Sequence, residues 1–230
     1  LTTNGLLLKK LAKELAGAGV TRINVSLDTL SNEKYNYITR CHMTDTPVDD
    51  IFAGMEECSK YGMPANKVNV VLMGGFNDTE IPDLVGLTRD RDLQVRFIEL
   101  MPIGQAKDWD KSTFISNKTV LESVPELQED GESGVSKLYR VPGYKGTVGL
   151  ISTISSHFCS QCNRLRLTAD GKLRPCLFSD REVDVRAAVR EGDEDAVYNC
   201  FLEALNLKPD EHHQGDHAQA THTNMNAIGG

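Results

Sequence analysis

Strand-like and helix-like patterns alternate over the first 105 residues, and few folds accommodate this order. Apolar residues recur at helical spacing from Leu7 to Leu15, and the run ends at Gly17. The same patterns predict helices near 7–15, 31–39, 48–61 and 79–90 and strands at 22–28, 67–73 and 95–101. Strands separated by helices of this length imply right-handed βαβ units, so we expect a parallel sheet.

The expected strands carry more polar residues than a parallel sheet usually contains, since such strands are normally apolar on both faces. These polar residues are Asn24, Ser26, Asp28, Lys67, Asn69, Arg96 and Glu99. A closed or half-closed barrel with a polar, ligand-filled interior accounts for them. The alternative is a sheet with exposed edges and one wet face. The fold class is α/β in either case.

The second part of the chain, 106–230, has a different pattern. Residues 106–145 are less regular and include the acidic loop 126–132, and a strand is expected at 147–152. A cysteine cluster follows, and then helices near 182–191 and 194–205. His212, His213, His217 and His222 lie in a polar tail whose irregular spacing favours a flexible linker over a metal site. We therefore expect two domains, 1–105 and 106–230.

Charge and composition exclude several classes of partner. The formal net charge is −8 at pH 7, which argues against a nucleic-acid or anionic-membrane surface. No apolar run approaches the roughly 20 residues that span a bilayer, and no signal peptide opens the sequence. We therefore expect neither a nucleic-acid nor a membrane partner.

Three of the six cysteines fall within 18 residues, at Cys159, Cys162 and Cys176. Two residues between the first two let one loop direct both sulfurs at one metal centre, and Asp170-Gly171 predicts a hairpin that returns the chain toward Cys176. Clustered thiols in a cytosolic chain indicate a metal before a disulfide.

Zinc and an iron–sulfur cluster both suit this set. His157 could complete a Cys₃His zinc site. Three cysteines could instead hold a [4Fe–4S] cluster and leave one iron free for a small molecule. Arg164 and Arg166 alternate on the strand beside the cysteines, and paired guanidinium groups suit phosphate, which favours the cluster.

Several segments occur here in the order and spacing of one family. They are Thr2-Thr3-Asn4-Gly5, Asn24-Val25-Ser26-Leu27-Asp28, Lys67-Val68-Asn69-Val70-Val71, Arg96-Phe97-Ile98-Glu99, Cys159-Ser160-Gln161-Cys162-Asn163-Arg164-Leu165-Arg166 and the terminal Gly229-Gly230. Over nearly its whole length the chain resembles the MoaA-type GTP 3′,8-cyclases, which are radical-SAM enzymes of molybdenum cofactor biosynthesis. The resemblance implies a partial, TIM-like radical-SAM barrel at 1–105 and a [4Fe–4S]-binding α+β extension at 106–230.

The resemblance also implies a role for particular residues. Cys159, Cys162 and Cys176 match the ligands of the carboxy-terminal [4Fe–4S] cluster, whose open iron faces the purine of GTP. Thr2, Lys67, Arg96, Arg164 and Arg166 match substrate-binding positions. Ser26 and Met101 match contacts to S-adenosylmethionine (SAM), and Gly229 and Gly230 match a tail that enters the active site and supports catalysis.

The implied reaction converts GTP to (8S)-3′,8-cyclo-7,8-dihydroguanosine 5′-triphosphate, which cyclic pyranopterin monophosphate synthase then consumes. The resemblance implies a cytoplasmic location, or a mitochondrial one in a eukaryote, and leaves the oligomeric state open, with a homodimer among the options. The Cys-x₃-Cys-x₂-Cys motif of the family's other cluster does not occur in this sequence, which begins at Leu1. We therefore expect an amino-terminally truncated chain that is inactive alone. The competing interpretations are a zinc-stabilised, non-catalytic module and a radical-SAM enzyme that modifies a peptide.

Overall fold

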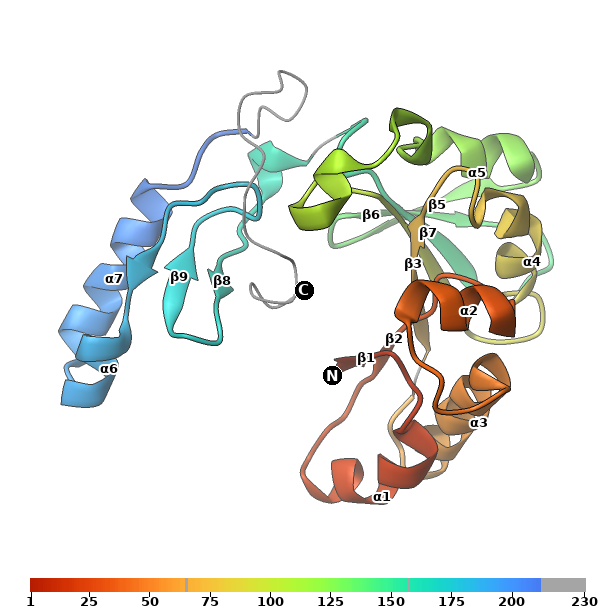
Figure 1. Ribbon diagram of the computed structural model, residues 1–230, viewed down its shortest axis with the longest axis horizontal. Coiled ribbons are helices and arrows are strands. Elements are labelled where there is room, and N and C mark those ends of the chain that lie inside the picture. Colours follow the sequence, from red (N-terminus) through yellow and green to blue (C-terminus); the bar gives the residue numbers. More distant parts are fainter. Residues whose placement is uncertain (65, 157, 212–230) are drawn as a thin grey trace. The chain divides into compact units, whose positions relative to one another are not determined.

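The computed structural model describes residues 1–64, 66–156 and 158–211. The chain divides into two compact units, which are considered separately below. The first unit comprises Leu1–Leu100 and Lys111–Ser155, and the second comprises Met101–Asp110 and Ser156–Gly230. Figure 1 gives the labels of the helices and strands.

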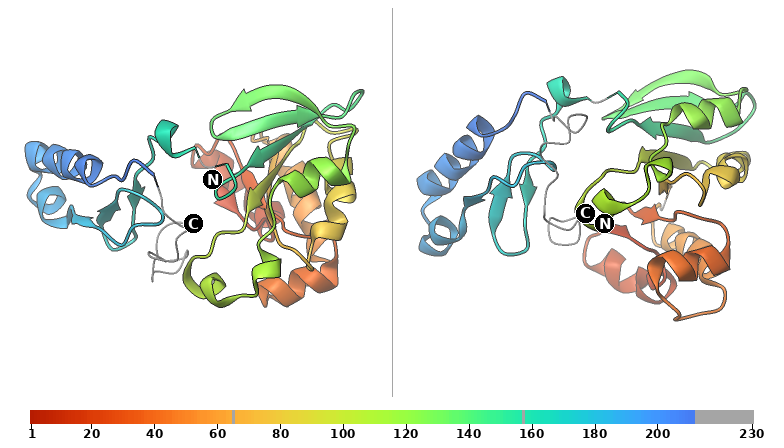
Figure 2. Two further views of the ribbon diagram at one scale, coloured as in Figure 1. Left: turned by 90° about the horizontal axis from the view of Figure 1, so that it is seen from above. Right: turned by 45° about the horizontal axis from the view of Figure 1, so that its top comes forward.

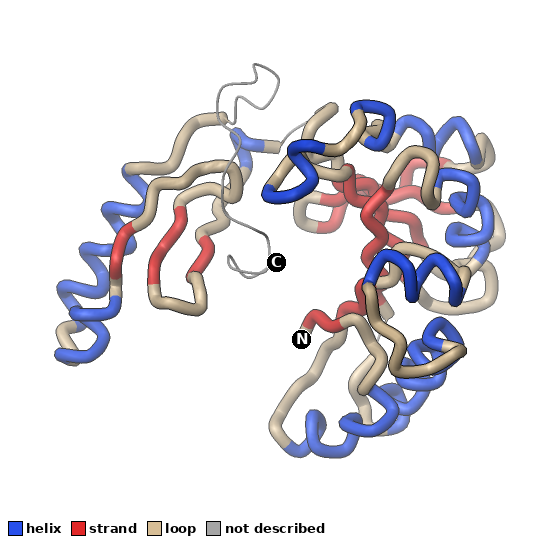
Figure 3. The backbone as a smooth tube through the Cα atoms, viewed as in Figure 1, coloured by secondary structure: helices blue, strands red, loops and turns tan. Residues whose placement is uncertain are grey.

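A seven-stranded sheet forms the centre of the first unit (Figure 3). In spatial order its strands are β1 (Thr2–Thr3), β2 (Asn24–Ser26), β3 (Lys67–Leu72), β4 (Gln94–Glu99), β7 (Thr147–Ile151), β6 (Ser136–Arg140) and β5 (Gln128–Ser133). Neighbouring strands from β1 to β7 are parallel, whereas β6 and β5 extend the sheet in antiparallel fashion. The prediction of an α/β fold with a mostly parallel sheet is confirmed.

Helices join the parallel strands as the sequence pattern predicts. They are α1 (Leu8–Gly17), α2 (Asn32–Thr39), α3 (Pro47–Lys60) and α4 (Ile81–Gly86), with the 3₁₀ turn η1 (Asp78–Glu80). The helix α5 (Lys118–Ser123) and the 3₁₀ turn η3 (Lys111–Thr113) fall in the segment 106–145, where no helix was predicted. The side chain of Ser31 caps α2 by accepting a hydrogen bond from the Lys34 amide, and Pro47 occupies the first turn of α3. The helix expected at 79–90 is shorter than predicted, because its start is a 3₁₀ turn and α4 ends at Gly86.

The two faces of the sheet differ sharply. Alternate residues of β3 and β4 are buried, including Val68, Val70 and Phe97, which belong to the hydrophobic core of this unit. The residues between them are half-buried and largely polar. The register aligns Asn24 with Lys67 and Gln94 in one row, and Ser26 with Asn69 and Arg96 in the next. This polar face explains why the strands depart from the apolar pattern of most parallel sheets.

The sequence patterns missed the β5–β6 hairpin. Most of β5 is exposed, so its side chains carry no apolar alternation, and backbone pairing with β6 holds it in place. Because β7 pairs with β4, the segment 111–155 belongs to the first unit. The compact units therefore do not separate at the predicted boundary between residues 105 and 106.

The second unit contains a three-stranded antiparallel sheet of β8 (Arg166–Leu167), β9 (Lys172–Arg174) and β10 (Val183–Asp184). It also contains α6 (Arg186–Glu191), α7 (Glu194–Asn206) and the 3₁₀ turns η2 (Gly104–Asp108) and η4 (Cys159–Gln161). Figure 2 shows α7 beside the strands, and its buried Ala204 packs in a small core with Leu173 and Val183.

The prediction of a helix from residue 182 was wrong at its start. Val183 is buried and pairs with Leu173, so these residues complete the small sheet as β10. The helix begins only after Asp184, whose carboxylate accepts a hydrogen bond from the Arg186 amide at 2.9 Å.

Candidate functional site

The cysteine-bearing hairpin of the second unit forms as predicted. Arg166 pairs with Arg174 and Leu167 with Leu173, and Gly171 occupies the tight turn with a φ of +80°. At that φ an L side chain is strained, so glycine suits the position. The paired strands of the hairpin are short, at Arg166–Leu167 and Lys172–Arg174.

The three predicted cluster ligands lie in this unit and are half-buried free thiols. Cys159 begins η4, and its carbonyl accepts a hydrogen bond from the Cys162 amide at 3.0 Å. Cys176 follows β9 directly after Pro175. The ammonium of Lys208 donates to the carbonyls of both Arg164 and Pro175, which brings the two cysteine-bearing segments together.

Within the described residues, no group of three or more His, Cys, Asp or Glu side chains is arranged to hold a metal ion. Sulfurs around one tetrahedral zinc lie about 3.8 Å apart, given a zinc–sulfur bond of about 2.3 Å. In a [4Fe–4S] cluster each cysteine binds a different iron, so the sulfurs are spaced more widely. Three half-buried free thiols on two adjoining segments supply donors that suit either kind of metal centre. His157, the fourth ligand of the zinc alternative, lies outside the described residues.

Arginines surround the cysteine hairpin. Burial lowers the pKa of Arg166, and the neighbouring charge of Arg164 lowers it further, whereas the Cys176 side chain opposes this shift. Arg164 is exposed, with its guanidinium carbon 5.7 Å from the centre of the Phe158 ring. The hairpin therefore concentrates positive charge beside Cys176, as anion binding requires.

The polar sheet face of the first unit carries four more predicted site residues. Burial lowers the pKa of Lys67, and the charges of Arg96 and Arg22 lower it further. Arg96 Nε donates to Gln94 Oε1 at 2.6 Å, so its side chain is oriented along this face. Ser26 lies in the same row as Arg96, and Thr2 pairs with Asn24 at the neighbouring strand.

Comparison with known proteins identifies the family of the chain. A model of the Radical SAM superfamily matches residues 1–88, and a model described as Molybdenum Cofactor Synthesis C matches residues 93–214. The GTP 3′,8-cyclase of Alkaliphilus oremlandii is 44% identical over 233 residues, which cover 100% of this chain and 71% of that protein. The chain belongs to the GTP 3′,8-cyclase family.

Other members of this family give the same result. The GTP 3′,8-cyclase of Heliobacterium modesticaldum is 41% identical, with 100% of this chain and 72% of that protein covered. Molybdenum cofactor biosynthesis protein 1 of Dictyostelium discoideum is 39% identical, with 99% of this chain but 37% of that protein covered. Membership of the radical-SAM superfamily implies a [4Fe–4S] cluster and SAM as cofactors.

The family resemblance implies three further site residues, Met101, Gly229 and Gly230. Met101 lies two residues after the end of β4 and is half-buried, and its carbonyl accepts a hydrogen bond from the Ile103 amide at 2.8 Å. Gly229 and Gly230 lie outside the described residues, as do the histidines of the tail. Among the residues that the structure describes, no helix is long and apolar enough to cross a membrane.

Asp28 lies just after β2 and Glu99 is the last residue of β4. The sequence pattern marked both carboxylates as polar strand residues but assigned them no role. Burial raises the pKa of Asp28 to about 6, although its carboxylate accepts a hydrogen bond from the Val71 amide at 2.7 Å. Glu99 is 2% exposed and accepts hydrogen bonds from the amides of Asn117, Ile154 and Ser155. Sequence reasoning missed these roles because the donors are far away along the chain.

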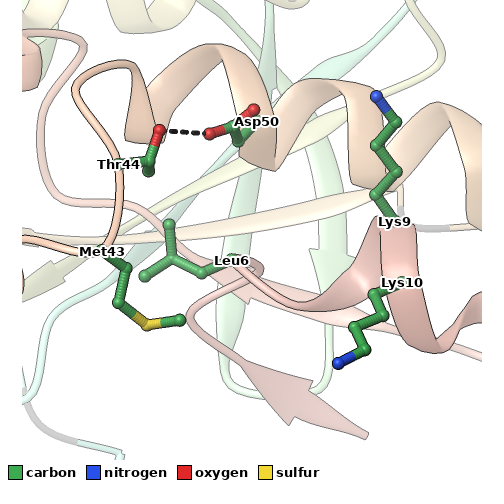
Figure 4. A pocket seen from close by; sticks show the side chains of 6 residues that line it. All are labelled: Leu6, Lys9, Lys10, Met43, Thr44 and Asp50. Atoms are coloured by element: carbon green, nitrogen blue, oxygen red, sulfur yellow. Dashed lines mark hydrogen bonds between the residues drawn. The ribbon is translucent and has the colours of Figure 1, made fainter.

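A pocket in the first unit contains none of the predicted site residues (Figure 4). Leu6, Lys9, Lys10, Met43, Thr44 and Asp50 line it. Thr44 Oγ1 donates to Asp50 Oδ2 at 2.7 Å, whereas the side chains of Lys9 and Lys10 point away from each other. The lysines therefore do not converge on a ligand, and we assign this pocket no part in the site.

Proposed function

We propose that this chain is the SAM- and GTP-binding part of a GTP 3′,8-cyclase of molybdenum cofactor biosynthesis. Its reaction converts GTP to (8S)-3′,8-cyclo-7,8-dihydroguanosine 5′-triphosphate, the substrate of cyclic pyranopterin monophosphate synthase. The observation that carries the proposal is the 44% identity to a GTP 3′,8-cyclase over the whole chain. A cytoplasmic location, or a mitochondrial one in a eukaryote, follows from this function.

Each cofactor has a proposed set of residues in this chain. Cys159, Cys162 and Cys176 hold a [4Fe–4S] cluster whose remaining iron is free for the purine of GTP. Ser26 and Met101 contact SAM, and the parallel strands form part of a radical-SAM barrel. When bound, these cofactors supply the radical chemistry and a substrate-binding iron, while the protein orients the substrate and shields it from water.

The basic side chains supply the charge that a triphosphate needs. Lys67 is partly desolvated and lies near Arg96 and Arg22, so a bound anion would relieve the repulsion among these cations. Arg164 and Arg166 provide a second basic group beside Cys176. We assign all four predicted cations, Lys67, Arg96, Arg164 and Arg166, to GTP, together with Thr2 at the edge of the sheet. Gly229 and Gly230 are proposed to enter the active site as a slender tail that completes it.

Anaerobic reconstitution of the chain with iron and sulfide tests the cluster assignment without depending on turnover. The expected result is about four irons per chain, and an EPR spectrum of the reduced protein that changes when GTP is added. The Cys162→Ser variant should lose most of this iron. A matched Cys58→Ser variant should keep it, because Cys58 is buried in the core of the first unit. One zinc per chain, no iron and no response to GTP would instead establish the zinc-stabilised module.

A further inference from the structure

The paired strands of the cysteine hairpin end before they reach the cysteines. β8 and β9 pair at Arg166–Arg174 and Leu167–Leu173, and the Thr168 amide donates to the Lys172 carbonyl at 2.9 Å. Hydrogen-bonded pairs alternate along an antiparallel ladder, so the next such pair beyond Arg166 and Arg174 would join Arg164 with Cys176. The ordered strands stop short of this pair.

Lys208 bridges the two segments beyond the last hydrogen-bonded pair of β8 and β9. Its Nζ atom lies 2.9 Å from the carbonyl oxygen of Arg164 and 2.8 Å from that of Pro175. One ammonium therefore joins a residue from each strand beyond the end of the ladder. Hydrogen bonds from a charged donor are stronger than those of the ladder itself, so this link fixes the separation of the two segments.

The position of Lys208 is itself set by the packing of α7. Lys208 lies two residues past the end of α7, and its amide donates to the Leu205 carbonyl at 3.1 Å. Ala204 of α7 is fully buried against the small core that contains Leu173 of β9. The lysine is thus anchored through the core to the hairpin whose open end it bridges.

Each accepting carbonyl belongs to a residue within two positions of a proposed cysteine ligand. Arg164 is two residues after Cys162, and Pro175 immediately precedes Cys176. We propose that Lys208 is a positioning residue that holds the Cys162 and Cys176 segments at the separation a cluster requires, without itself touching the cluster. This inference rests on the proposed function, since it assigns Lys208 to the same cluster site.

The first test uses the chain without iron. Lys208→Met removes the ammonium but keeps an unbranched side chain, whereas Lys208→Arg keeps a charged donor. We expect Lys208→Met to speed amide hydrogen exchange at Arg166 and Arg174 by about tenfold, and Lys208→Arg to change it by less than about threefold. Lys13→Met on the exposed face of α1 is the matched control and should leave exchange in the hairpin unchanged.

The second test uses the reconstituted chain. Iron loss to a chelator should be at least about fivefold faster from Lys208→Met than from the wild type, with Lys208→Arg close to the wild type. Normal iron retention and normal hairpin exchange in Lys208→Met would overturn this inference while leaving the proposed function intact. A wild-type chain that takes up no cluster would overturn the proposed function, and the positioning role with it.

Discussion

Arg166 and Arg174 face each other directly across the β8–β9 pair, yet only Arg174 is buried, at 2% exposure. Its guanidinium bonds to the carboxylate of Glu182 at 2.8 Å and to Asp180 at 3.3 Å. Like charges placed opposite each other on a sheet repel, so the acidic residues allow two arginines to share this position. Glu182 also accepts a hydrogen bond from Lys172 at 2.8 Å.

Glu182→Gln should therefore destabilise the second unit by about 3 kcal/mol, because it leaves the buried Arg174 charge without its main partner. Urea denaturation, followed through the hydrogen exchange of β9, measures this loss. Glu191→Gln, at the exposed end of α6, is the matched control and should change stability by less than about 0.5 kcal/mol. Equal stability of the two variants would show that Glu182 is not needed to compensate the charge of Arg174.

Asp28→Asn should alter the pH dependence of stability in the first unit. Because burial raises the pKa of Asp28 to about 6, the folded state holds its proton more tightly than the unfolded state. Stability should fall as pH rises from about 4 to about 6, and then stay level. Asn keeps an acceptor for the Val71 amide but has no charge, so the variant should be about 2 kcal/mol more stable at pH 8.

Thermal denaturation of wild type and Asp28→Asn between pH 4 and pH 8 provides the measurement. The two curves should diverge as pH rises from about 4, near the ordinary aspartate pKa of 3.8, to about 6, and then keep a constant separation. Parallel curves across this range would show that Asp28 ionises normally.

Glu99→Gln should destabilise the first unit by about 2 kcal/mol at pH 7. The carboxylate accepts three backbone amides and the Ser155 hydroxyl, and an amide side chain would direct its NH₂ group at some of these donors. Although burial alone would raise the pKa of Glu99, these hydrogen bonds lower it overall. Its contribution is therefore present above the usual pKa of glutamate and is lost as pH falls through the lowered value.

Urea denaturation at pH 7 and at pH 3 separates these effects. The difference between wild type and Glu99→Gln should shrink at the lower pH. A constant difference would instead assign the effect to packing.

Lys67→Met should weaken GTP binding by about tenfold, because it removes one of the cations proposed to contact the triphosphate. Isothermal titration calorimetry with GTP measures the affinity, and Lys137→Met, at an exposed position of β6, is the control. Since burial already lowers the pKa of Lys67, its removal should not destabilise the fold. Unchanged affinity would place the triphosphate away from this sheet face.

The sequence predicted best those elements whose side chains alternate. The strand expected at 67–73 is β3 (Lys67–Leu72), because its buried apolar residues alternate with half-buried, mostly polar ones on the other face of the sheet. The exposed strand β5 gave no such signal, since backbone pairing determines its conformation. Thus the parallel core was predictable, whereas the antiparallel extension was not.

The candidate site shows the same limit. The Asp170-Gly171 turn is a local signal, and it correctly predicted the hairpin near the cysteines. The link from Lys208 to Arg164 and Pro175 joins residues 44 and 33 positions apart, and no spacing rule predicts such a contact. Likewise, the amides that surround Glu99 are brought there only by the completed fold.

The chain crosses between the two compact units three times, after Leu100, Asp110 and Ser155. Each unit therefore consists of two separate segments of the sequence, so a single deletion or insertion cannot remove or transfer one complete unit alone. A recombination break at residue 105 would sever the segment 101–110 and separate β4 from its partner β7. Loss of 156–230 in one step would remove the cysteine hairpin but leave 101–110 of the same unit behind.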